Sequence, residues 1–227
     1  MPYGEALEVQ RDVARRRIAG TIDQDVLLLV EHPHVVTLGR SSKQASMVAT
    51  PELLAARGVE LFEVERGGDV TYHGPGQLVG YPIIDLKRHR KDLHWYLRQV
   101  EEAVIQSLAS FGVPAGRNQG YTGVWVGSSG ETWTRKIASI GVHARDWVTW
   151  HGFALNVTTD LSYFDLMVPC GIADVQMTAL ANEITGPAPS LAEVRDAVTR
   201  AFGEVFSLVP VAGASLPVST PDAAHGA

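Results

Sequence analysis

The sequence predicts a single α+β, or mixed α/β, domain in which one mostly antiparallel or mixed β-sheet is covered by a few helices. Three observations favour this class. Helical periodicity is confined to a few segments, and the β-like runs cluster between them. Predicted strands and helices do not alternate regularly along the chain. With 227 residues the chain is large enough to bury a core without disulfides or a structural metal.

The first third of the chain predicts one helix and three strands. Apolar residues set among charges indicate an amphipathic helix over residues 5–18, with Gly20 as its stop signal. Strands are expected over residues 25–31 and 35–38, separated by His-Pro-His, and over residues 59–65, where apolar residues alternate with glutamates. A glycine- and proline-rich stretch follows.

The rest of the chain contains the clearest helix, over residues 93–111, with Asp92 as its N-cap and Gly112 as its stop. An apolar run over residues 81–86 precedes it. The segments that follow it are predicted from alternation and from the capping box at Ser190 and Glu193: strands at residues 123–126, 136–143 and 148–157, and a last helix that continues to about residue 205.

Composition indicates an ordinary globular protein, with 45% hydrophobic and 19% charged residues. We expect one catalytic domain over residues 1–209 and a disordered tail over residues 210–227, which is small, polar and proline-rich. One cysteine forms no internal disulfide, which fits the cytoplasm. The longest apolar run, residues 26–30, is too short to span a bilayer, and the first 20 residues do not resemble a secretory signal.

The net charge of −6 argues against nucleic acid as a partner, because phosphate binding needs a surplus of Lys and Arg. Two basic islands, residues 15–17 and residues 87–91, stand on this acidic background. They have two interpretations: solvated surface, or a docking patch for an acidic protein.

The single cysteine, Cys170, is either a small buried hydrophobe or a nucleophile. It lies between Pro169 and Gly171, so we expect a constrained turn, and turns commonly present catalytic groups. A cysteine attacks only as the thiolate, which a nearby cation would favour. Lys136 and His73 are the candidate partners. Strand alternation places Lys136 on an apolar face, where an ammonium needs a partner or a function, although a lysine at the mouth of the strand is equally consistent with the pattern.

The glycine-rich run over residues 66–77 is the densest local signal, because glycines let backbone approach a ligand closely. It lacks the spacing of a nucleotide phosphate loop. Residues 38–42 predict a turn in preference to a ligand loop. His32 and His34 share one face of an extended segment, yet no further ligands complete a metal site, so we expect neither metal nor cofactor.

Five segments taken together resemble the octanoyltransferases of lipoate biosynthesis, the lipoyl(octanoyl) transferases, which are relatives of lipoate–protein and biotin–protein ligases. The segments are RGGDVTYHGPGQ at 66–77, GVWV at 123–126, RKIASIG at 135–141, HGFALNV at 151–157 and PCG at 169–171. The resemblance covers about residues 26–180 and implies a biotin/lipoate ligase-like catalytic fold.

The resemblance also implies a mechanism and partners. Cys170 would take octanoyl from octanoyl-acyl carrier protein as a thioester, and a lysine of a lipoyl domain would resolve it into an amide. The acceptors would be the lipoyl domains of 2-oxoacid dehydrogenase complexes and the glycine cleavage H protein. Lys136 would lower the pKa of the thiol and relay protons. Cofactor, nucleic acid and membrane are not expected.

The acyl site implied by the resemblance draws on three of the matching segments, whose small residues suit a slot for a straight apolar chain. Its expected residues are Arg66, Gly67, Gly68, Asp69, Val70, Thr71, Tyr72, His73, Ser139, Ile140, Gly141, Gly152, Phe153 and Ala154.

Alternative functions remain open at this point. An ATP-dependent lipoate ligase would share the fold but would not need Cys170, whereas a lipoyl or octanoyl amidotransferase would keep the cysteine and take its acyl group from a lipoylated protein. A non-catalytic acyl-binding protein would retain the slot alone. A cysteine hydrolase would admit water to the acyl-enzyme.

Overall fold

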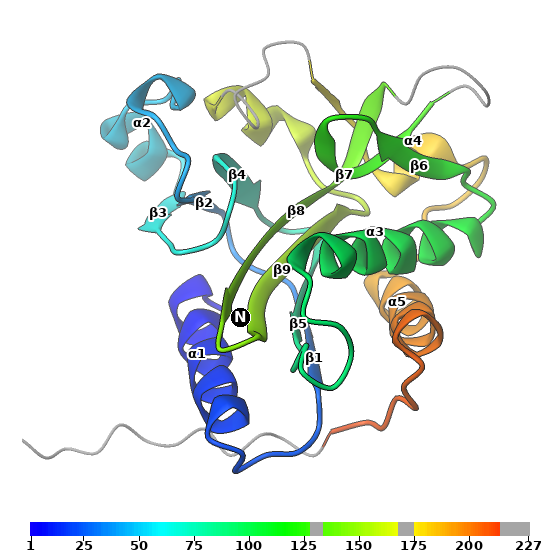
Figure 1. Ribbon diagram of the computed structural model, residues 1–227. Coiled ribbons are helices and arrows are strands. Elements are labelled where there is room, and N and C mark those ends of the chain that lie inside the picture. The colour runs from blue at the N-terminus through cyan, green and yellow to red at the C-terminus, as the bar shows by residue number, and fades with distance from the viewer. Residues whose placement is uncertain (128–133, 168–174, 214–227) are drawn as a thin grey trace, which may run out of the picture.

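The computed structural model describes residues 1–127, 134–167 and 175–213, and it forms two β-sheets with helices around them (Figure 1). The larger sheet has the strand order β1-β5-β9-β8-β7-β6, and β10 pairs with β8 in parallel. The smaller sheet has the order β3-β2-β4. The α+β class predicted from the sequence is confirmed, but the single sheet that was expected is wrong, because β2, β3 and β4 form a second sheet.

The strands of the two sheets have the following bounds: β1 Val26–Val30, β2 Val35–Leu38, β3 Glu60–Glu63, β4 Val70–His73, β5 Gln77–Ile83, β6 Ala115–Asn118, β7 Tyr121–Val126, β8 Arg135–Arg145, β9 Val148–Asn156 and β10 Gln176–Met177. The helices are α1 Tyr3–Ile18, α2 Pro51–Ala56, α3 Leu93–Ala109, α4 Leu180–Glu183 and α5 Leu191–Phe206, with 3-10 helices η1 at Gln44–Ser46 and η2 at Leu161–Leu166.

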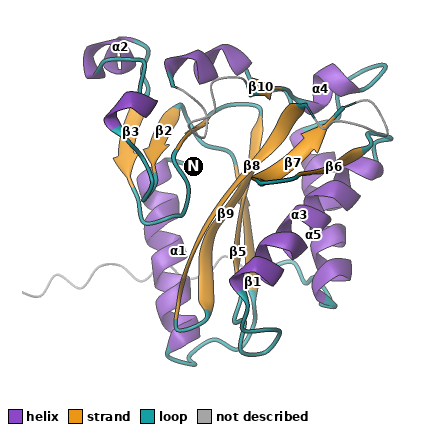
Figure 2. Ribbon diagram, turned by 45° about the horizontal axis from the view of Figure 1, so that its top comes forward, coloured by secondary structure: helices purple, strands orange, loops and turns teal. Residues whose placement is uncertain are grey.

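Helices cover the larger sheet on both faces. Helices α3 and α5 pack on one face and bury the main core, to which alternate residues of β5 and β9 such as Leu78 and Leu155 contribute (Figure 2). The intervening residues, such as Val79 and Ala154, point to the opposite face, where Ala6 of α1 meets them. Because of this alternation, one face of each strand builds the core beneath α3 and α5, and the other face packs against α1.

The predicted helix ends are confirmed at α3 and α5. The Asp92 side chain accepts a hydrogen bond from the Trp95 backbone N–H, and Gly112 follows α3 with a φ of 74°. Ser190 and Glu193 form both hydrogen bonds of a capping box at the start of α5. Side-chain chemistry therefore sets where these helices begin.

The glycine-rich stretch differs from its prediction, because it contains strand β4 and the first half of β5. Glycine is required there by crowding between strands: a Cβ at Gly80 would lie 2.2 Å from the Phe153 ring. Strand β4 pairs with β2, and the backbone N–H of Gly67 donates to Val142 O of β8 at 2.8 Å. The smaller sheet is thereby tied to the larger one.

The two basic islands meet acidic side chains within the chain. Arg17 is buried against Asp25 (3.2 Å), which also accepts a hydrogen bond from His89 (2.9 Å), while Lys87 lies 3.7 Å from Asp85. Arg17 is therefore part of a buried ion pair and belongs neither to solvated surface nor to a docking patch. Within the described ranges, no helix is both long and apolar enough to cross a membrane. Most of the predicted tail, residues 214–227, lies outside the described residues.

Candidate active site

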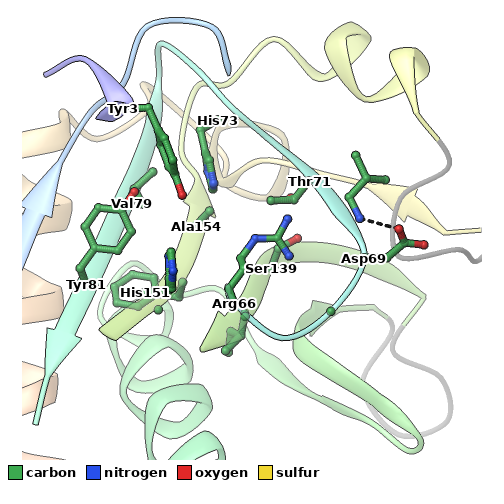
Figure 3. A pocket seen from close by; sticks show the side chains of 16 residues that line it. Tyr3, Arg66, Asp69, Thr71, His73, Val79, Tyr81, Ser139, His151 and Ala154 are labelled. Carbon is green, nitrogen blue, oxygen red and sulfur yellow. Dashed lines mark hydrogen bonds between the residues drawn. The ribbon is translucent and has the colours of Figure 1, made fainter. Parts of the chain in front are cut away.

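A pocket of about 480 Å³, counted with the open space at its mouth, lies where the glycine-rich stretch crosses strands β8 and β9. Figure 3 shows Tyr3, Tyr81 and His151 gathered at one end and Asp69 toward the other. The pocket is lined by Tyr3, Arg66, Gly68, Asp69, Val70, Thr71, His73, Val79, Tyr81, Ser139, Ile140, Gly141, His151, Gly152, Phe153 and Ala154.

Cross-strand pairs of small residues build the floor of the pocket. Ser139 of β8 pairs with Ala154 of β9, and Gly141 pairs with Gly152. A Cβ at Gly141 would lie 2.7 Å from the backbone O of Gly67, so the glycine-rich stretch reaches the strand only because that position has no side chain. The floor of the pocket therefore consists of small side chains and backbone.

Arg66 and Asp69 are fixed in the wall by hydrogen bonds from the smaller sheet and its connections. The buried Arg66 guanidinium donates to the backbone O of Thr37 (2.6 Å) and to its Oγ1 (2.9 Å). Asp69 accepts from the hydroxyl of Ser46 (2.7 Å) and from the backbone N–H of Val70 (2.8 Å). These contacts hold the glycine-rich stretch in one conformation over the pocket.

Residues 38–42 were predicted as a turn; Leu38 ends β2, and residues 39–42 pack beneath the glycine-rich stretch. The backbone N–H of Gly39 donates to Asp69 O and that of Ser41 donates to Gly68 O. Residues 39–42 therefore support the glycine-rich stretch from outside the pocket and are not among the residues that line it.

Buried aromatic and imidazole groups form the inner end of the pocket. His73 bonds to Gln77 Oε1 (2.9 Å), and Tyr3 stacks on its ring at a centroid distance of 5.9 Å. His32 bonds to the Tyr81 hydroxyl at 2.7 Å. Burial lowers the pKa of His73 to about 3 and that of His32 to about 4, so both imidazoles are neutral at neutral pH.

His151 completes this end and is held in an unusual backbone conformation, with a φ of 55°. Its backbone N–H donates to Gln10 Oε1 (3.0 Å), and its buried Nε2 lies 3.8 Å from Glu65 Oε2, too far for a hydrogen bond. Proximity to His151, followed by donation from Arg11 and Trp150, holds the pKa of Glu65 well below its usual range. Burial lowers the pKa of His151.

Lys136 lies on β8, the strand that supplies Ser139 and Gly141 to the pocket floor. Its side chain is buried, with Nζ 5.3 Å from the centroid of the Trp125 ring. Its backbone O accepts from the Thr178 N–H (2.9 Å), next to the parallel pairing of Met177 with Lys136. The structure therefore buries the Lys136 side chain and does not leave it as a surface lysine at the mouth of the strand.

The structure brings together all of the predicted acyl-site residues except Gly67 and Tyr72. Gly67 contributes its backbone to the contact with β8. Tyr72 projects into the core of the smaller sheet, where its ring stacks on Tyr163 at 5.0 Å and its hydroxyl bonds to His34. Cys170, the predicted nucleophile, lies outside the described residues.

Sequence reasoning missed four lining residues: Tyr3, Val79, Tyr81 and His151. His151 opens the HGFALNV segment, so that motif offered a signal, whereas nothing near Tyr3 suggested that α1 would reach the pocket. His32 and His34 bond to tyrosines, and among the described residues no group of three or more His, Cys, Asp or Glu is placed to hold a metal.

Comparison with known proteins identifies the family to which the chain belongs. The family model described as lipoyl protein ligase A/B catalytic domain matches residues 2–203, and the chain belongs to that family. The family resemblance predicted from the five segments is thus confirmed.

Curated relatives narrow the class further. The octanoyltransferase of Solibacter usitatus is 50% identical over 214 residues, covering 94% of this chain and 93% of the relative. The octanoyltransferase of Acidobacterium capsulatum is 51% identical over 212 residues, covering 90% and 86%. The chain is therefore an enzyme of the acyltransferase class.

Solved structures agree on the fold. A bi-partite lipoate protein ligase from Thermoplasma acidophilum, solved in a study with its E2 lipoyl domain, has a TM-score of 0.72 at 20% identity and covers 93% of this chain and 84% of its own. Lipoate-protein ligase A bound with ATP has a TM-score of 0.68 at 18% identity, covering 88% and 81%. At these identities the likeness concerns the fold alone.

Proposed function

We propose that the chain transfers an octanoyl group from octanoyl-acyl carrier protein to a specific lysine of a lipoyl domain, through a thioester on Cys170. Lys136 favours the thiolate and relays protons. The observation that carries the proposal is the position of Lys136: a buried ammonium on the strand that also forms the floor of the pocket.

The pocket suits an unbranched acyl chain. Its floor consists of small residues and backbone, and Val79 supplies apolar surface beside it. The pairing of β7 with β8 shifts in register between Val124–Ala138 and Trp125–Lys136, so β8 is irregular just after Lys136. At a rise of up to about 3.3 Å per residue, Ser139 lies at most roughly 10 Å beyond Lys136 and Gly141 lies further still. An acyl chain whose carbonyl lies beside Lys136 would run over these residues toward the inner end.

Cys170 lies close in the sequence to the strand that pairs beside Lys136. Only six positions separate Cys170 from Gln176, and Gln176 and Met177 pair with Arg135 and Lys136 in β8. Because each residue extends the chain by at most about 3.5 Å, this pairing limits how far the thiol can be from the lysine.

The proposed chemistry balances without ATP. The Cys170 thiolate attacks the carbonyl carbon of the carrier thioester, the bond to the carrier sulfur breaks, and the leaving sulfur takes a proton from the Lys136 ammonium. The amine of the acceptor lysine then attacks the acyl-enzyme, gives a proton to Lys136 and releases Cys170 as thiolate. The products are an amide and a free carrier thiol, and an amide is more stable than the thioester it replaces.

The acceptors in this proposal are lipoyl domains of 2-oxoacid dehydrogenase complexes and the glycine cleavage H protein. Octanoyltransferase relatives at about 50% identity support the acyl group, and the lone cysteine is consistent with the reducing cytoplasm. An ATP-dependent lipoate ligase is the main alternative on this fold.

Intact-protein mass spectrometry tests the proposal. Incubation with octanoyl-acyl carrier protein and without ATP should add one octanoyl mass to the chain, and hydroxylamine should remove it, because hydroxylamine cleaves thioesters. Cys170→Ala is the matched control and should stay unmodified. An unmodified wild-type mass while octanoyl reaches a lipoyl domain would sink the covalent mechanism, and transfer that requires ATP would favour the ligase.

A further inference from the structure

The ring of Trp125 contacts the Lys136 side chain, and the reaction proposed above does not use it. Trp125 of β7 and Lys136 of β8 are register partners, so their side chains project from the same face of the sheet. The 5.3 Å between Nζ and the ring centroid falls within the roughly 6 Å over which an aromatic face attracts an ammonium. Both residues are 2% exposed, and the attraction is stronger away from water.

A bare backbone lies against the end of the same side chain. A Cβ at Gly123 would lie 2.7 Å from Cε of Lys136 and 3.3 Å from Nζ, so glycine is required for the lysine to reach its position. The Gly123 N–H donates to the buried Glu101 carboxylate of α3 at 3.2 Å. The contact between lysine and glycine is thereby anchored to a helix of the main core.

Packing alone does not explain the indole. Nε1 of Trp125 is buried and finds no hydrogen-bond partner within residues 1–127, 134–167 and 175–213. A buried donor without a partner costs free energy that phenylalanine would not incur. Tryptophan does, however, present the strongest cation-attracting face of the aromatic residues.

We propose that Trp125 is a positioning residue for acyl transfer, whose ring face holds the Lys136 ammonium where it favours the reacting thiolate. The inference rests on the proposed role of Lys136 and adds the group that fixes its position. The neighbouring charges are engaged in pairs of their own: Arg135 with Glu183, and Glu101 with Arg98 and Arg117. Every variant below retains these pairs.

Alkylation of the single cysteine by iodoacetamide reports the thiolate at one site, because the chain has only one thiol. An ordinary thiol is about 3% ionised at pH 7, so loss of the ammonium slows alkylation there by at most roughly thirtyfold. At pH 9.5 the thiol ionises without help. A change in ionisation therefore slows only the reaction at pH 7, whereas a change in access slows both.

We expect Trp125→Leu and Trp125→Met to slow alkylation at pH 7 by roughly three- to tenfold, less than Lys136→Ala, with little change at pH 9.5. Trp125→Phe keeps a ring face and should stay within about twofold of the wild type. In the Lys136→Ala background, Trp125→Leu should have no further effect. The exposed Trp147 supplies the matched control, since Trp147→Leu should leave both rates unchanged.

The outcomes separate this inference from the proposed function. If Lys136→Ala alkylates at the wild-type rate at pH 7, the proposed role of Lys136 fails. If Lys136→Ala is slow while both folded apolar variants of Trp125 react like the wild type, the positioning role alone is overturned. Equal slowing by Trp125→Leu with and without Lys136, or at both pH values, overturns it as well. Circular dichroism and melting temperature identify the variants that are folded.

Discussion

Buried neutral histidines should make the protein unstable in mild acid, and His73 provides the sharpest test. Its pKa falls from an ordinary 6.5 to about 3, first because of burial and then because of His32. At pH 5 the unfolded imidazole is almost fully protonated and the folded one is not, so the unfolded state binds the extra proton. Stability is therefore complete above pH 6.5 and is lost as the pH falls toward 3.

The size of the effect follows from these values. Between pH 7.5 and pH 5 one such histidine costs about 2 kcal/mol of unfolding free energy, and His32, with a pKa of about 4, adds a similar amount. The acidic residues contribute in addition, so the wild-type loss alone does not isolate His73.

Urea unfolding of His73→Gln at pH 7.5 and pH 5 isolates the contribution of His73 to the loss of stability. The variant is less stable at pH 7.5, because it loses a packed ring, but its loss between pH 7.5 and pH 5 should be about 2 kcal/mol smaller than that of the wild type. His94→Gln, at an exposed position in the first turn of α3, is the matched control for replacing an imidazole by an amide. An undiminished pH dependence in His73→Gln would show that the imidazole is not kept neutral by the fold.

Three substitutions test other features. Ser190→Ala should lower the unfolding free energy by about 1 kcal/mol without changing activity, as seen by urea unfolding and transfer assays, because it removes the capping box of α5. Gly123→Ala should lower the unfolding free energy by about 2 kcal/mol or more, because Gly123 has a φ of 133° and a Cβ there would lie 2.7 Å from the Lys136 side chain. Gly4→Ala in α1, where a Cβ would have its nearest contact at 3.6 Å, should leave the unfolding free energy unchanged or raise it. Tyr3→Ala should lengthen the pocket and raise the preference for decanoyl over octanoyl donors by roughly tenfold in mass-spectrometric competition. Tyr3→Phe is the control and should not change this preference. An unchanged preference in Tyr3→Ala would place the end of the acyl chain elsewhere.

The elements that the sequence predicted well are those whose periodicity is long and uninterrupted. Helix α3 repeats its apolar residues over four turns and starts at an Asp N-cap, so both its face and its first residue could be predicted. Strand β4 could not, because its four residues follow glycines and contain no alternation long enough to detect. Its existence depends on pairing with β2, a contact between residues far apart in the chain.

The candidate site shows the same division. Gly141 and Gly152 could be expected to line a pocket because each stands in one of the segments that resemble the octanoyltransferases. A short motif of this kind fixes the backbone near its own residues. The inner end is assembled from α1, β5 and β9, and no single segment carries that information. Tyr72 was assigned to the pocket because it stands in the motif, yet its side chain projects from β4 into the smaller core.

The alternation of β5 and β9 separates residues that build the main core from residues that line the pocket. Leu78 and Leu155 face helices α3 and α5, while Val79 and Ala154, one position away along the same strands, face the pocket. If this pocket binds the acyl group as proposed, selection or protein engineering can therefore reshape it one strand position at a time, while the residues in between continue to build the core.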